Sequence, residues 1–158
     1  DILFGHQVAP RLTASGCTAV MAARGALIKP WLFREVISGD WDITAEERLV
    51  IYRRYVALAL EHWGDDEHGR SRIREFLLWH LGFWCRYAPP RPDGSFPEMQ
   101  HRESWTPRSA LEALLARADA DAHAFLADAL MAGTEVDPSL APAPGDAREI
   151  DDDAAEAG

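Results

Sequence analysis

The feature that most constrains the fold is a short apolar run that ends in a small-residue turn. Residues 18–22 read TAVMA, and residues 23–26 follow as ARGA. The run predicts a short buried strand, and Pro30 predicts a helix over residues 30–37, because proline is favoured in the first helical turn. Strand, turn and helix in this order are typical of a parallel α/β fold. The fifteen residues before residue 16 are too few to supply the rest of such a sheet. We therefore expect the chain to be the end of a larger protein.

The pattern changes near Gly39 to that of amphipathic helices. Thr44 and Glu47 form a capping box at the start of a helix, and apolar residues then recur at steps of three or four until Gly64. Further helices are predicted over residues 7–15, 69–87 and 120–131, and from residue 106 onward. We expect an antiparallel helical bundle over residues 39–133.

The negative charge lies at the C-terminal end. The formal net charge is −10, and residues 119–158 hold eleven acidic residues and one arginine, so residues 1–118 are neutral. The folded part therefore need not repel a polyanion. From Thr134 onward the large apolar residues nearly vanish, which predicts a disordered acidic tail over residues 134–158.

Several kinds of site are not indicated by the sequence. The two cysteines, Cys17 and Cys85, form no CxxC motif and are expected to be small core residues in a reducing compartment. The six histidines show no metal-ligand spacing, and His62 and His80 are expected to be packed or capping residues. No segment is long enough to span a membrane, no signal peptide is recognised, and no nucleophile–base pair or carboxylate pair is found.

The turn around Arg24 is the strongest site candidate. Small residues at positions 23–26 would let a phosphate approach the backbone amides, and Arg24 would add a bidentate positive charge. In βα-barrels the loops after the last strands commonly bind a phosphate. An ordinary turn with a surface arginine is the alternative, and the pattern alone leaves both open.

A second candidate is a group of arginines near the start of the second long helix. Arg70 and Arg74 share a face, and Arg72 lies between them. Arginines among aromatic residues can contact an RNA backbone. A solvated helix face, paired with neighbouring glutamates, is the alternative for any one of them. Further basic residues would add positive charge to this group: Lys29, Arg34, Arg53, Arg54 and, at the other end of the same helix, Arg86.

Several segments together resemble the tRNA-dihydrouridine synthases, in particular the branch that modifies the uridine on the variable-loop side of tRNA. They are residues 1–3 (DIL), 15–17 (SGC), 20–33 (VMAARGALIKPWLF), 41–43 (WDI), 47–49 (ERL), 60–64 (LEHWG), 74–78 (REFLL) and 85–87 (CRY). The resemblance covers about residues 1–118 and excludes the tail.

This resemblance implies a mostly α chain. Residues 1–38 would be the last βα unit of a TIM (β/α)8 barrel that binds FMN, and residues 39–133 a helical tRNA-binding domain. In the family, NADPH reduces FMN, a hydride passes to C6 of a flipped-out uracil, and a barrel cysteine protonates C5. Asp1 matches the end of a flavin-contacting Asn-Gly-Asp motif, and Ala23 and Arg24 match the pair that holds the FMN phosphate.

The resemblance also limits what this chain can do. Neither cysteine stands at the family's catalytic position, so no catalytic residue is assigned and the chain alone is expected to be inactive. We further expect a monomer that binds tRNA, without a metal or a membrane, in the cytoplasm or the nucleus. A stand-alone helical module that binds RNA or protein without catalysis is the alternative.

Overall fold

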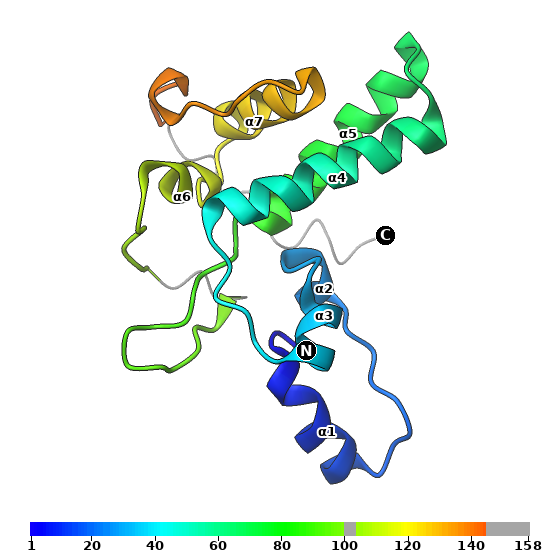
Figure 1. Ribbon diagram of the computed structural model, residues 1–158, viewed down its shortest axis with the longest axis vertical. Helices are drawn as coiled ribbons and strands as arrows, with labels where there is room; N and C mark the ends of the chain where they lie inside the picture. Colours follow the sequence, from blue (N-terminus) through cyan, green and yellow to red (C-terminus); the bar gives the residue numbers. More distant parts are fainter. Residues whose placement is uncertain (100–103, 145–158) are drawn as a thin grey trace.

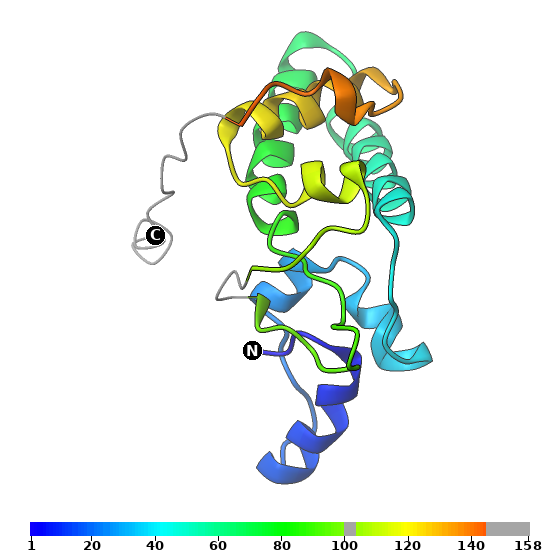
Figure 2. The same cartoon turned by 90° about the vertical axis from the view of Figure 1, so that its left-hand side faces the viewer.

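The computed structural model describes residues 1–99 and 104–144, and within these ranges it contains helices and loops but no β-strand. Figure 1 shows two regions, one below the other. The lower region holds the short helices of the N-terminal part, and the upper region holds the long helices. The turned view in Figure 2 shows the same division, with the loop that follows α5 running back down to the lower region.

The N-terminal region contains a 3-10 turn and three helices: η1 (Gly5–Gln7), α1 (Val8–Ser15), α2 (Arg24–Ile28) and α3 (Leu32–Ser38). The expected helix over residues 7–15 is confirmed, and Gly16 ends it in the left-handed conformation with φ 67°. The helix predicted from Pro30 begins two residues later, at Leu32. The sequence did not indicate α2.

The buried strand expected over residues 18–22 is absent. These residues form an extended segment, in which Val20 is 37% and Met21 86% exposed. A strand needs a neighbour to pair its backbone groups, and the described residues provide none. The fold of the described chain is therefore mostly α, without the expected βα unit.

The upper region contains α4 (Ala45–Trp63), α5 (Glu67–Trp84), α6 (Ala110–Leu115) and α7 (Ala120–Ala132). The capping box at Thr44 is confirmed, because its hydroxyl accepts from the Glu47 amide and the Glu47 carboxylate accepts from the Thr44 amide. Gly64 and Gly133 end α4 and α7 with positive φ, as expected. The predicted third helix begins at Ala110, four residues later than expected, and is capped by Ser109.

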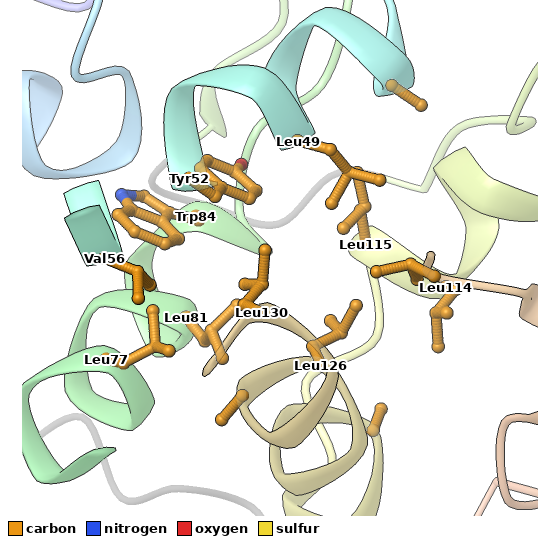
Figure 3. Packing of buried hydrophobic residues seen from close by; sticks show 14 residues of the cluster. Leu49, Tyr52, Val56, Leu77, Leu81, Trp84, Leu114, Leu115, Leu126 and Leu130 are labelled. Carbon is orange, nitrogen blue, oxygen red and sulfur yellow. The ribbon is translucent and has the colours of Figure 1, made fainter. Parts of the chain in front are cut away.

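Buried apolar side chains form two clusters. The helical core joins α4, α5, α6 and α7, and Figure 3 shows its residues pointing toward one another. Its largest members are Tyr52 and Trp84, whose rings stack with centroids 4.0 Å apart. The N-terminal core gathers side chains from residues 3–43 and from the loop after α5, including Phe4, Ile28 and Tyr87.

Arg48 lies where the two cores meet and is fully buried. Its Nε donates to the Tyr52 hydroxyl at 3.2 Å, and its Nη2 donates to the Trp84 carbonyl at 3.1 Å. The guanidinium also lies over the ring of Tyr87, 4.7 Å from its centroid. One side chain therefore contacts both clusters.

The start of the expected disordered tail differs from the prediction. Residues 134–144 fold back onto the helices and contain η3 (Pro138–Leu140). Val136 is buried in the helical core, and Arg117 donates to the carbonyls of Pro142 and Ala143 at 2.5 and 3.3 Å. Residues 145–158 lie outside the described residues. Among the described helices, none is both long and apolar enough to span a membrane.

Candidate functional site

The carboxylate of Asp1 organises the turn that carries Arg24. Its Oδ1 accepts from the amides of Ile2 at 2.8 Å and Ala23 at 3.3 Å, and its Oδ2 accepts from the Gly25 amide at 3.1 Å. The three residues expected to form the site, Asp1, Ala23 and Arg24, are therefore together in space. Ala23 is the N-cap of α2 and offers no side-chain cap of its own, so Asp1 takes that role.

Gly25 is a further residue of this turn whose importance the sequence did not reveal. A Cβ atom at this position would lie 1.7 Å from the carbonyl oxygen of Ile2. Only glycine lets α2 pack so closely against the first residues of the chain. The signal was present in the ARGA pattern, but a small residue in a turn does not show which backbone it will meet.

Arg24 is the exposed positive group of the turn. Its side chain is 58% exposed, and its Nε lies 3.9 Å from Asp1 Oδ2. This distance is long for a charge-assisted hydrogen bond, so most of the guanidinium's hydrogen-bonding capacity stays available to a ligand. The Arg24 amide, in the first turn of α2, has no acceptor within the described ranges.

The turn offers fewer free backbone amides to an anion than the sequence suggested. Two of its amides, those of Ala23 and Gly25, already donate to Asp1. A phosphate at this turn would therefore depend mainly on the Arg24 side chain and the Arg24 amide.

The arginines near the start of α5 are mostly engaged in ion pairs. Arg70 Nε lies 2.5 Å from Asp65 Oδ1, and Arg74 Nε lies 3.0 Å from Asp128 Oδ1. Arg72 is exposed and makes no ion pair with any described residue. The shared face of Arg70 and Arg74 is thus partly neutralised, but by Asp65 and Asp128 and not by the neighbouring glutamates that the solvated-face alternative named.

Lys29 is excluded from an RNA-binding surface because it is buried. Its Nζ lies 2.6 Å from Glu35 Oε2 and 4.2 Å from the centroid of the Phe4 ring. Burial lowers the pKa of the Lys29 ammonium, and the hydrogen bond to Glu35 opposes this shift. The pair is a structural element of the N-terminal core.

The cysteines and histidines provide no additional site. Cys85 is buried as expected, but Cys17 is exposed beside the extended segment, so its assignment to the core is wrong. His80 contacts the Phe76 carbonyl at 2.7 Å and the Tyr55 hydroxyl at 3.1 Å, which confirms a packed histidine. No group of three or more metal-ligating side chains gathers within residues 1–99 and 104–144.

Comparison with known proteins identifies relatives of this sequence. The family model for dihydrouridine synthase matches residues 1–77. The human tRNA-dihydrouridine(47) synthase [NAD(P)(+)]-like protein is 49% identical over 90 residues, which cover 56% of this chain and 14% of the human protein. The Saccharomyces cerevisiae tRNA-dihydrouridine(47) synthase [NAD(P)(+)] is 40% identical over 120 residues, covering 74% of this chain and 18% of the yeast protein.

The Aspergillus oryzae protein of the same name is 45% identical over 104 residues, covering 64% of this chain and 14% of that protein. This chain therefore spans less than a fifth of the length of these relatives. No solved structure matches it. Over residues 1–77, the chain is therefore similar to the dihydrouridine synthase family.

Proposed function

We propose that this chain is the C-terminal part of a flavin-dependent tRNA-dihydrouridine synthase that reduces a uridine of tRNA with NADPH. The observation that carries the proposal is the turn at residues 23–25, which Asp1 holds so that the Arg24 side chain is exposed. The relatives, whose names specify tRNA and NAD(P)(+), support the substrate and the reductant.

The extended segment over residues 18–22 supports a barrel origin for the N-terminal region. Val20 and Met21 are apolar and exposed, and they lead directly into the turn. An exposed apolar segment of this kind is a suitable edge for pairing with a further strand. We infer that residues 1–38 complete an FMN-binding TIM barrel whose other strands lie in the longer protein, and that residues 39–133 form its tRNA-binding domain.

The residues of the turn fit the phosphate of FMN. The exposed guanidinium of Arg24 and the Arg24 amide would hold it, and Ala23 leaves room beside them. Asp1 would act as a positioning residue, because its carboxylate fixes the turn. When bound, FMN supplies the hydride for the uracil ring. The catalytic cysteine would come from the remainder of the protein.

The test is an activity and cofactor measurement on the full-length protein that carries this sequence. We expect bound FMN after gel filtration and NADPH-dependent conversion of uridine to dihydrouridine in tRNA, detected as a mass gain in nucleoside mass spectrometry. A full-length protein that binds RNA but holds no flavin and reduces no uridine would contradict the proposal and favour a stand-alone binding module.

Replacing Arg24 by alanine tests the assigned phosphate contact. Because two turn amides are already taken by Asp1, loss of the guanidinium should reduce the affinity for FMN at least tenfold, which corresponds to about 1.4 kcal/mol. FMN content after gel filtration and fluorescence titration of the apoprotein measure this change. Arg11→Ala, which removes an exposed arginine of α1, is the control and should leave FMN binding unchanged. Equal FMN affinity in Arg24→Ala and the wild type would refute the assignment.

A further inference from the structure

One face of α5 carries a strip of aromatic and cationic side chains that the site described above does not use. The strip consists of Arg72, Phe76, Trp79, Phe83 and Arg86, spaced by four, three, four and three residues. This spacing places Arg72, Phe76, Trp79 and Phe83 on one side of α5, and Arg86 lies two residues beyond the end of the helix. Trp79 is 51% and Phe76 42% exposed.

The strip is distinct from the buried face of α5. Ile73, Leu77, Leu81 and Trp84 are the apolar residues that α5 buries. The Phe76 ring stacks on Trp63 of α4 with centroids 5.2 Å apart, and the strip residues after it contact one another. The Trp79 and Phe83 ring centroids are 4.9 Å apart, and the Arg86 guanidinium lies 5.5 Å from the centroid of the Phe83 ring. The exposed rings of Phe76 and Trp79 line one surface hollow, and an exposed apolar patch is typical of a binding surface.

The chemistry of the strip favours single-stranded nucleic acid over an apolar protein surface. Exposed aromatic rings provide stacking platforms for unpaired bases, and arginines along the same face attract phosphates. Arg72 makes no ion pair with the described residues, in contrast to its neighbours Arg70 and Arg74. Glu75 lines a surface hollow together with Phe76 and Trp79, and its carboxylate can accept hydrogen bonds from the N–H groups of a base.

One end of the strip lies near the helix that follows the turn carrying Arg24. Helices α2 and α5 pack against each other, and Phe83 packs against the N-terminal core, which contains Ile28 of α2. The strip therefore starts beside the helix that carries Arg24. At a rise of 1.5 Å per residue, Phe83 and Arg72 are separated by about 16 Å along α5.

We propose that this strip binds an unpaired segment of the tRNA, with a base stacked on Trp79 and a flanking phosphate at Arg72. The inference rests on the proposed function, because it takes tRNA as the substrate. It adds a specific surface of the helical domain and a stacking contact.

The experiment measures the affinity of labelled tRNA for the full-length protein by fluorescence anisotropy over a series of salt concentrations. Trp79→Ala should weaken binding about tenfold with an unchanged salt slope, because a stacking contact and no charge is lost. Trp79→Phe should retain most of the affinity. Arg72→Gln should reduce the slope of log K against log[salt] by about 0.7–0.9, as expected for one lost phosphate contact.

A matched control and a kinetic readout separate this role from a structural one. Leu58→Ala removes a side chain of α4 that is 46% exposed, and it should leave the tRNA affinity unchanged. In the uridine reduction assay, Trp79→Ala should raise KM for tRNA and leave kcat and FMN content unchanged.

The outcomes distinguish a failure of the proposed tRNA binding by the strip from a failure of the proposed function. A wild-type protein that reduces tRNA, together with a Trp79→Ala variant of equal affinity and KM, overturns the strip alone. Loss of self-association in that variant at unchanged tRNA affinity would instead assign the strip to a protein contact. A wild-type protein that binds no tRNA at low salt overturns the proposed function itself.

Discussion

At the scale of single residues, the turn at Gly25 depends on the absence of a side chain. The close approach of Gly25 to the Ile2 carbonyl lets the amides of Ala23 and Gly25 reach the Asp1 carboxylate. The position of Arg24 is therefore a consequence of its two neighbours in the turn and of Asp1.

Gly25→Ala should destabilise the N-terminal region by about 3 kcal/mol, because a Cβ would collide with backbone that cannot move aside without repacking. Gly82→Ala in α5 is the matched control. A Cβ at Gly82 meets no atom within 4 Å, and alanine has the higher helix propensity, so a gain of about 0.5–1 kcal/mol is expected. Urea denaturation of both variants measures the difference, and a neutral Gly25→Ala would contradict the close contact.

At the scale of elements, the start of α7 depends on one carboxylate with two roles. Asp119 caps the helix by accepting from the Ala122 amide at 3.0 Å, and it accepts two hydrogen bonds of 2.7 Å from Arg117. The hydrogen bonds from Arg117 are the main cause that lowers the pKa of Asp119 below its ordinary value of 3.8.

A lowered pKa in the folded state means that the ionised form of Asp119 stabilises the protein above about pH 4. This contribution is lost as the pH falls through the folded-state pKa. Asp119→Asn keeps the capping oxygen and removes the charge, so it should cost about 1–2 kcal/mol at pH 7, and this cost should shrink progressively as the pH falls below the ordinary value of 3.8. Unfolding by urea at several pH values tests this, with Asp121→Asn in the same helical turn as the control. A cost that does not shrink as the pH falls from 7 to the acid limit of the folded state would contradict the role of the charge.

The sequence predicted those elements whose signals are local. The capping box at Thr44 and the terminal glycines Gly64 and Gly133 act within one helical turn, and all three are confirmed. The strand over residues 18–22 was not found, because a strand is defined by a partner that may be distant in sequence. Helix α2 was not predicted, because five residues are too short for a periodic pattern.

For the candidate site, too, the sequence did not predict contacts between residues that are distant along the chain. The sequence, through its resemblance to a family, brought together Asp1, Ala23 and Arg24, and the structure places them side by side. Their cofactor roles stay predictions. No local pattern encodes the contact of Gly25 with Ile2, the hydrogen bonds from the turn amides to Asp1, or the burial of Lys29. Each of these features depends on residues that are distant in the sequence.

At the scale of the whole molecule, residues 134–144 complete the helical core, although their composition resembles that of the acidic tail. Val136→Ala should cost about 1–2 kcal/mol, because Val136 is 5% exposed and its methyl groups fill the core. Leu140→Ala is the control, because Leu140 is 73% exposed and should contribute almost nothing. Thermal unfolding of both variants decides whether this segment belongs to the folded unit, and equal melting temperatures would show that it does not.

The burial of Arg48 between the two cores has a consequence for how the molecule moves. Separating the cores would break contacts of a guanidinium that holds the Tyr52 hydroxyl and the Trp84 carbonyl and covers the Tyr87 ring. Such an opening would disturb both clusters at once, so Arg48 couples the stability of one cluster to that of the other. The two regions should therefore melt in a single cooperative transition, and the distance between the Arg24 turn and the α5 strip should vary little in solution.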